Sequence, residues 1–98
     1  TMKSKHLIQD DGYAHAVDLM AYDNGEPSWD IVDYDNIADA MRKAAQEVGI
    51  DLIWGAAWHK MLTVSPDTAE NLMNEYIDLR RSEGRRPFID GPHFQLAT

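Results

Sequence analysis

The stretch that decides the fold is residues 16–22, AVDLMAY, followed by DNGEP at 23–27. Its apolar residues Val17, Leu19 and Ala21 are separated by single residues, a two-residue period that is typical of a strand with one buried face. The Asp, Asn, Gly and Pro residues at 23–27 favour a turn. The sequence therefore predicts a half-buried strand over residues 16–22 that ends in a turn.

Two helices are predicted beyond this turn. The first is capped by Asp33 or Asp35 and ends before Gly49, where a left-handed glycine is common. The second begins at 65–66, a serine cap followed by proline, and ends at Gly84. Apolar residues recur at helical spacing in both: Ile37, Ala40, Met41, Ala44 and Val48 in the first, and Ala69, Leu72, Met73, Tyr76 and Leu79 in the second.

Two further strands complete the pattern. Residues 50–54, IDLIW, indicate a buried strand, and residues 93–96 a short final one. Because strands and helices interleave irregularly, we expect an α+β fold with a small antiparallel sheet flanked by helices. A chain of 98 residues is long enough for one domain, so residues 1–98 are expected to form a single unit.

Composition excludes several classes of protein. Seventeen acidic against nine basic residues give a net charge of −8, which argues against nucleic-acid binding. The chain has no cysteine, so disulfides and thiolate metal sites are excluded. No apolar run approaches the roughly 18 residues of a membrane span, and no signal peptide opens the sequence.

Histidines and carboxylates near both ends of the chain are candidates for a metal site. His6 and Asp18 lie near the start, and Asp90 and His93 near the end. A catalytic zinc takes three protein ligands of these types and leaves a fourth position for water. Spacing alone does not show that the two ends meet, and a lone histidine is more often a surface or core residue.

These segments together resemble a known family. Ser4-x-His6, then Ala14-x-Ala16-x-Asp18, and finally 90–93, DGPH, are similar to motifs of zinc peptidases that include D-alanyl-D-alanine carboxypeptidases and phage L-alanyl-D-glutamate endolysins. Helical residues 37–41 and the WGAAW stretch at 54–58 strengthen the resemblance to the phage members. The similarity covers nearly the whole chain and implies a hedgehog-like peptidase fold.

The resemblance implies a role for each matching residue. His6, Asp18 and His93 are expected to be zinc ligands, and Asp90 the catalytic acid and base. An ion held in this way activates water at neutral pH and polarises the peptide carbonyl. Pro92 restricts the backbone between the acid and the last ligand.

Four other residues are weaker candidates for contacts with substrate or with the ligands. Ser4 is expected to be a hydrogen-bond partner, and His15, an odd number of residues from Asp18, to be structural or to support the ligands. His59 could reach the substrate but is more simply an exposed loop histidine. Of the three tryptophans, one or two should anchor the core while a third, such as Trp58, lines a peptide groove.

Two departures from the family pattern bear on the expected activity. Residues 9–13 form an inserted turn between the first two motifs. Family members also carry a helical segment with an arginine before the first motif, so the chain is expected to lack that segment, and an upstream segment or second chain would complete the fold. Arg85 and Arg86 could replace the missing charge, although a solvated pair is the simpler interpretation.

The expected function is zinc-dependent hydrolysis of peptidoglycan stem peptides at the L-Ala–D-Glu bond in phage lysis. The alternatives are a D-Ala-D-Ala carboxypeptidase and a non-catalytic fragment that binds zinc or cell wall. Without a signal peptide, the protein would accumulate in the host cytoplasm and reach the wall in the periplasm after a membrane lesion.

Overall fold

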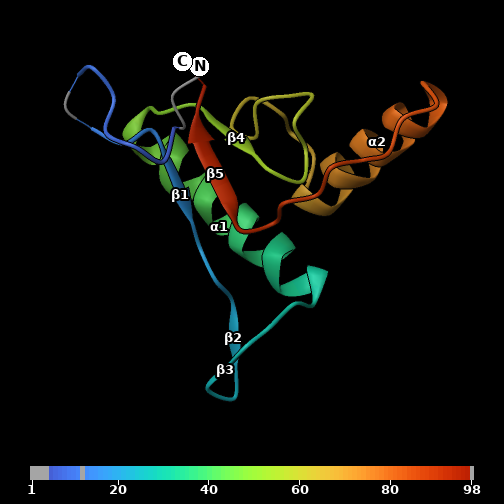
Figure 1. The fold of residues 1–98 in the computed structure, drawn as a ribbon, viewed down its shortest axis with the longest axis horizontal. Helices are drawn as coiled ribbons and strands as arrows, with labels where there is room; N and C mark the ends of the chain where they lie inside the picture. Colours follow the sequence, from blue (N-terminus) through green and yellow to red (C-terminus); the bar gives the residue numbers. More distant parts are fainter. Residues whose placement is uncertain (1–4, 12, 98) are drawn as a thin grey trace.

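The fold is built around a three-stranded antiparallel sheet, shown in Figure 1 of the computed structural model, which describes residues 5–11 and 13–97. Strand β5 (His93–Leu96) lies between β1 (Ala16–Asp18) and β4 (Leu52–Trp54). The final strand has the predicted bounds, and the strand predicted over 50–54 begins two residues later. The α+β class with a small antiparallel sheet is confirmed.

The strand predicted over residues 16–22 is shorter than expected. Strand β1 ends at Asp18, which pairs with His93, the first residue of β5, so the central strand has no further residues to pair with. The chain then forms a separate hairpin from β2 (Tyr22–Asp23) and β3 (Glu26–Pro27). Asn24 and Gly25 at its tip both have positive φ, 51° and 80°, as two-residue hairpin turns of type I′ require.

Helix α1 (Ile31–Val48) passes behind the sheet in Figure 1. Asp30 caps it by accepting a hydrogen bond from the Val32 amide, so the predicted cap at Asp33 or Asp35 is wrong. The cap lies earlier because Asp30 has the extended backbone that a cap needs, while the later aspartates are already helical. Gly49 ends the helix with φ 74°, as predicted.

The buried stripe of α1 matches the prediction only in part, because Ile37 and Met41 pack against the core while Ala40, Ala44 and Val48 are exposed. Ala38 and Ala45 are buried, whereas Ala44 and Val48 are exposed. Small residues at the buried positions let the helix approach the sheet, where Ala38 packs in one cluster with Trp54. The cluster is the core of the protein and comprises Ala21, Tyr34, Ala38, Trp54, Ala56, Ala57, Leu62, Ala69, Leu72, Met73 and Phe94.

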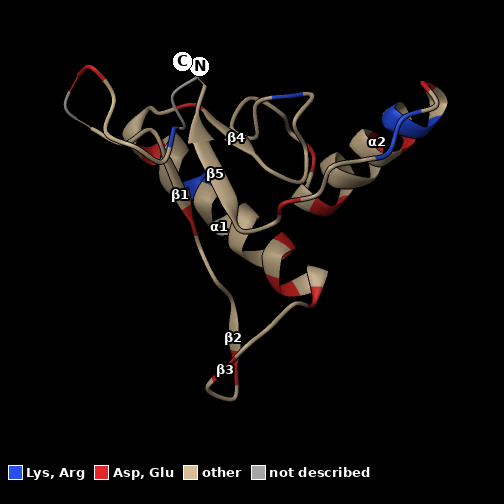
Figure 2. Ribbon diagram, viewed as in Figure 1, with Lys and Arg blue, Asp and Glu red and all other residues tan. Residues whose placement is uncertain are grey.

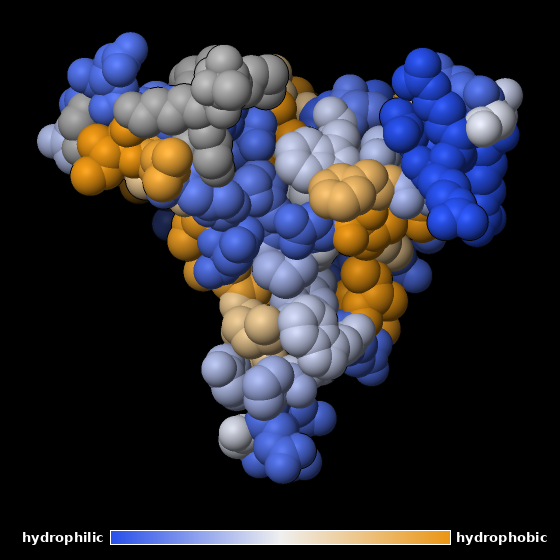
Figure 3. Space-filling view, in the orientation of Figure 1, coloured by the Kyte–Doolittle hydropathy of each residue, from blue (hydrophilic) through white to orange (hydrophobic). Residues whose placement is uncertain are grey.

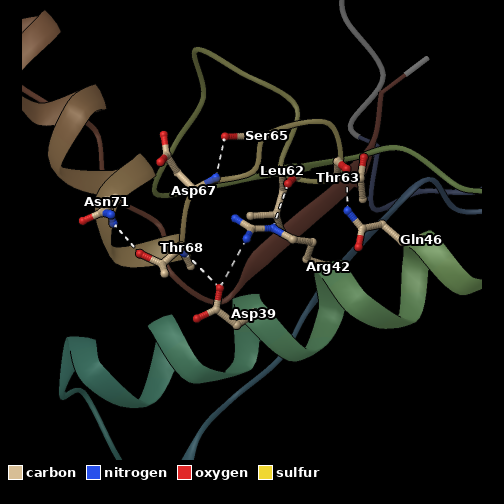
Figure 4. Close-up of polar contacts among 10 residues, drawn as sticks. Asp39, Arg42, Gln46, Leu62, Thr63, Ser65, Asp67, Thr68 and Asn71 are labelled. Carbon is tan, nitrogen blue, oxygen red and sulfur yellow. Dashed lines mark hydrogen bonds and ion pairs between the residues drawn. The ribbon is translucent and has the colours of Figure 1, made fainter.

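Helix α2 (Ala69–Ser82) is capped by Thr68 rather than by Ser65. Ser65 instead accepts a hydrogen bond from the Asp67 amide in a turn before the helix, which delays the start by three residues. Asp39 of α1 also accepts a hydrogen bond from the Ala69 amide at 2.9 Å (Figure 4). The first amides of a helix have no partner within the helix, and Asp39 binds one of them. Polar contacts therefore fix the start of α2 against α1.

The loop between β4 and α2 is held by two further side chains of α1. Arg42 Nε donates to the Leu62 carbonyl at 2.9 Å, and Gln46 Nε2 donates to the Thr63 carbonyl at 2.7 Å (Figure 4). Because these bonds satisfy carbonyls of buried residues, they order a segment that has no regular secondary structure of its own. The loop thereby returns the chain from the sheet to α2.

A buried carboxyl group lies on α1. Asp35 is 8% exposed, and its Oδ1 atom has no hydrogen-bond partner among the described residues. Burial, together with the nearby charges of Glu70, Asp39 and Asp30, raises the pKa of Asp35 to about 6. The folded state therefore favours the protonated carboxyl, and ionisation at neutral pH costs stability.

Replacing Asp35 by asparagine is expected to stabilise the protein at pH 7 by about 1–3 kcal/mol. The folded pKa lies above the unfolded one, so the wild type loses stability as pH rises from about 4 to about 6, and the neutral variant does not. Urea unfolding of both proteins at pH 7 and pH 4 measures the difference. Asp78→Asn on the exposed face of α2 is the control. An equal gain for Asp35→Asn at both pH values would contradict the assignment.

Candidate metal centre

The pairing of β1 with β5 places two candidate ligands next to each other. Asp18 and His93 are directly opposite in the antiparallel register, so their side chains project from the same face of the sheet. The distance between Asp18 Oδ1 and His93 Nδ1 is 3.4 Å. Two residues far apart in the chain are thus brought into contact by strand pairing alone.

The third candidate ligand, His6, is carried to the same place by the segment before β1. Ile8 and Ala14 form an antiparallel bridge, Gln9 N donates to the Tyr13 carbonyl, and His15 N donates to the Lys5 carbonyl. These contacts join residues 8 and 9 to residues 13 and 14, so the chain folds back beside β1. His6 Nε2 lies 3.1 Å from His93 Nδ1 and 3.6 Å from Asp18 Oδ1.

The three donor atoms have the spacing that one zinc ion requires. Ligand atoms bound about 2.0–2.1 Å from a tetrahedral zinc lie roughly 3.3 Å apart, and the three observed separations are 3.1, 3.4 and 3.6 Å. Two imidazoles and one carboxylate are also a common donor set for catalytic zinc. His93 is 10% exposed at its side chain, while His6 and Asp18 are 40% and 58% exposed. The group can thus hold a metal ion and leave one side open to solvent.

Asp90, the candidate acid, lies immediately before the turn that leads into His93. The Asp90 amide donates to the Gly55 carbonyl at 2.8 Å, and the Gly55 amide donates to the His93 carbonyl at 2.8 Å. The His93 amide donates back to the Asp90 carbonyl at 3.1 Å. Gly55, at the end of β4, therefore binds both the candidate acid and the candidate ligand through its backbone.

Close approach explains why a glycine occupies position 55. A Cβ atom there would overlap the carbonyl oxygen of Asp90 and lie 2.9 Å from the His93 Cβ. The buried Trp54 holds the same turn, because its Nε1 atom donates to the Gly91 carbonyl at 2.8 Å. Pro92 continues the arrangement by accepting a hydrogen bond from the Leu19 amide. The backbone around Asp90 is thus fixed on several sides.

The three tryptophans differ in burial, and one of them anchors the core, as predicted. Trp54 is fully buried, while Trp29 is 73% exposed. Trp58 packs against the His93 ring with the ring centroids 5.2 Å apart, and its Nε1 atom donates to the Phe88 carbonyl. Trp58 therefore borders the candidate metal centre and restrains the ring of one ligand.

The other weak candidates lie away from the three donor atoms. His15 Nε2 is 2.7 Å from Asp11 Oδ2, and the pKa of Asp11 is lowered by the hydrogen bond from the Tyr13 amide and by this contact. The sequence predicts that His59 is an exposed loop residue. Its side chain is only 10% exposed, however, and His59 Nε2 lies 2.9 Å from Glu75 Oε1. It is half-buried because its ring packs on Tyr76. Ser4 lies outside the described residues.

Glu75 forms a small ion-pair group on α2. Hydrogen bonds from Lys60 and His59 lower the pKa of Glu75 below its usual range. Lys60 Nζ lies 2.7 Å from the carboxylate and is half-exposed, so the pair is a surface contact of modest strength. This group joins the loop after β4 to α2 and explains the position of His59.

The arginines after α2 lie at the end of the helix that is far from the sheet. Lys and Arg residues gather there in Figure 2, and the same region is strongly hydrophilic in Figure 3. Arg85 and Arg86 are exposed, and the Arg86 carbonyl accepts a hydrogen bond from Arg80 Nε. The solvated interpretation of this pair therefore agrees with their position.

Apolar surface borders the turn that contains Asp90. Figure 3 shows it over the segment that leads from α2 into β5, where Phe88 is 63% and Ile89 38% exposed. A pocket of about 240 Å³ also adjoins Asp90. It is lined by Trp29, Ile31, Tyr34, Ile89, Asp90, Gly91 and Pro92. Exposed aromatic and aliphatic groups of this kind can contact a peptide substrate.

Two residues of this region make contacts that the sequence alone does not predict. Gly55 stands in the sequence only as part of the WGAAW motif, and its contact with Asp90 depends on a turn that is distant along the chain. Gln95 is not among the predicted site residues, although its Oε1 atom lies 2.9 Å from His93 Nε2. Its position two residues after a histidine in a strand is the available signal, because such residues share a face.

The whole chain is similar to one family of known proteins. Neither the curated proteins nor the solved structures include a significant match. A family described as phage L-alanyl-D-glutamate peptidase matches residues 1–97. The match includes every residue of the candidate metal centre and the turn around Asp90. The chain therefore belongs to the phage L-alanyl-D-glutamate peptidase family, whose members act on peptidoglycan.

Proposed function

We propose that this protein is a zinc peptidase that cleaves the L-Ala–D-Glu bond of peptidoglycan stem peptides during phage lysis. The observation that carries the proposal is the convergence of His6, Asp18 and His93 at mutual distances of 3.1–3.6 Å in a chain of this peptidase family. No helix among the described residues is long and apolar enough to cross a membrane. The expected place of action is the cell wall, reached from the host cytoplasm.

The three proposed ligands have the right chemistry for a catalytic ion. Neutral imidazoles on His6 and His93 and one carboxylate on Asp18 would leave a zinc ion with net positive charge. Such an ion lowers the pKa of bound water to about 7 and polarises the carbonyl of a bound peptide. The exposure of His6 and Asp18 leaves room for substrate on the open side.

Asp90 is the proposed acid and base. Its carboxylate would accept the proton of the attacking water and deliver it to the nitrogen of the leaving amine. The hydrogen bonds of the Asp90 and His93 backbones to Gly55 fix the position of this residue relative to a ligand. A rigid position reduces the reorganisation that proton transfer requires.

The surface around this turn provides the proposed contacts with substrate. Trp58 packs against His93, and the exposed Phe88 continues this aromatic surface with a ring separation of 6.1 Å. The pocket lined by Trp29 and Tyr34 lies on the Asp90 turn as well. A stem peptide bound here would meet apolar groups next to the proposed catalytic residues.

Asp90→Asn is expected to lower the rate of peptide release from purified sacculi by about 10²–10⁴-fold. The amide cannot accept the proton, while its shape preserves the turn, so zinc content should remain equal to that of the wild type. Mass spectrometry of the released fragments identifies the bond, and new N-terminal D-Glu is expected.

Two controls separate this proposal from its alternatives. Asp78→Asn, which changes an exposed carboxylate on α2, should leave the rate unchanged. Release of terminal D-Ala would indicate a carboxypeptidase instead, and zinc binding without any cleavage by the wild type would indicate a non-catalytic binding domain. Full activity of Asp90→Asn would refute its role as acid and base.

A further inference from the structure

We propose that Gln95 is a positioning residue that sets the tautomer of His93. This inference rests on the proposed metal centre, in which His93 binds through Nδ1. Gln95 Oε1 lies 2.9 Å from Nε2, the other nitrogen of the same ring. With the Gln95 amide in this orientation, its carbonyl oxygen accepts a hydrogen bond from the ring, and this arrangement favours the tautomer that carries its proton on Nε2. The lone pair of a neutral His93 then lies on Nδ1, the atom that faces Asp18 and His6.

The strand geometry explains how Gln95 reaches this position. His93 and Gln95 are two residues apart in β5 and project from the same face of the sheet. The residue opposite Gln95 on β1 is Ala16, whose small side chain leaves space above the strand. The amide of Gln95 can therefore turn along the strand toward the imidazole. No other element is needed to make the contact.

Packing holds the His93 ring in the orientation that this bond requires. Trp58 lies against the ring at an interplanar angle of 34°, and His6 meets it edge-on at 81°. The side chain is 10% exposed, so water has little access to compete for the ring nitrogens. A ring flip would exchange nitrogen and carbon positions and break the bond to Gln95. The packing and the hydrogen bond thus favour the same arrangement.

The consequence of losing this bond is a mixture of tautomers. Without the acceptor, the tautomer that carries its proton on Nδ1 becomes similar in free energy to the one protonated on Nε2. The Nδ1-protonated tautomer cannot bind a metal through Nδ1. Hydrogen-bond partners of ligand histidines typically change metal affinity by about 10–100-fold when they are removed. We therefore expect Gln95→Met to weaken zinc binding by about this factor. Gln95→Glu, which retains an acceptor oxygen, should preserve most of the affinity.

The test uses two measurements on the full chain. Nitrogen-15 NMR of the metal-free protein at pH 8 reports the protonated nitrogen of His93, and titration with zinc in a competing chelator reports affinity. The wild type and Gln95→Glu should show the proton on Nε2, and Gln95→Met a mixture with weaker zinc binding. Gln46→Met, which loses a side-chain hydrogen bond to the Thr63 carbonyl far from His93, should change neither measurement.

The outcomes separate this inference from the proposed function. A proton on Nδ1 of His93 in the wild type would overturn the role of Gln95, as would unchanged zinc affinity in Gln95→Met. If the wild-type protein failed to bind zinc, the proposed function would be wrong. A proton on Nε2 that is lost in Gln95→Met would still support the effect of Gln95 on the ring. Equal losses in Gln95→Met and Gln95→Glu would show a purely structural effect and contradict the inference.

Discussion

Replacing His93 by alanine is expected to abolish zinc binding and peptidase activity together. His93 Nδ1 lies 3.1 Å from His6 Nε2 and 3.4 Å from Asp18 Oδ1, so it is the atom that joins the two other donors. Without it, one imidazole and one exposed carboxylate remain, too few ligands for a catalytic zinc site. The zinc content after dialysis and the release of peptides from sacculi measure the two losses.

His15→Ala is the matched control for this variant. It also removes a histidine next to β1, but His15 contacts Asp11 rather than the three donor atoms. We expect it to retain stoichiometric zinc and most of the activity, with a small loss of stability. Stoichiometric zinc in His93→Ala would show that the ligands are assigned wrongly. Loss of zinc in both variants would show a general effect on folding.

Gly55→Ala is expected to destabilise the fold by about 3 kcal/mol, a large effect for a single methyl group. The added Cβ would overlap the backbone of Asp90, which cannot move aside as a flexible side chain could. For a domain of this size the loss corresponds to a decrease of roughly 12–24 °C in Tm. Thermal unfolding followed by circular dichroism measures it.

The comparison for this variant is another glycine with free space around it. Gly84 has φ 70°, and a Cβ added there would meet no atom within 4 Å, so Gly84→Ala introduces backbone strain without overlap. A cost of about 1 kcal/mol is expected there. If both variants lost the same stability, the close approach of Gly55 to Asp90 would not be the cause. Zinc affinity should fall in Gly55→Ala alone, because Gly55 contacts the His93 backbone and Gly84 lies beyond α2.

Much of the secondary structure follows from local sequence. The final strand, the left-handed Gly49 and the turn at Asn24 and Gly25 depend on nearby residues, and all three are predictable. The starts of both helices are not. Several residues before each helix could act as a cap. Asp30 and Thr68 are the ones with the extended backbone that a cap needs, and Asp39 of α1 also binds the first amide of α2.

The candidate site is predictable from the family resemblance rather than from spacing. His6, Asp18 and His93 meet because β1 and β5 pair in one register and because a hairpin returns residue 6 to the sheet. Neither event is visible in the local pattern of residues. The contacts of Gly55 with Asp90 and of Gln95 with His93 form only in the folded chain, which is why local spacing does not show them.

The most direct test of the metal centre is a crystal structure of the protein grown with zinc, recorded on both sides of the zinc absorption edge. We expect one anomalous peak bonded to His6 Nε2, His93 Nδ1 and the Asp18 carboxylate at about 2.0–2.2 Å. A peak elsewhere, or well-ordered side chains of residues 6, 18 and 93 with no peak between them at saturating zinc, would contradict the proposed zinc peptidase.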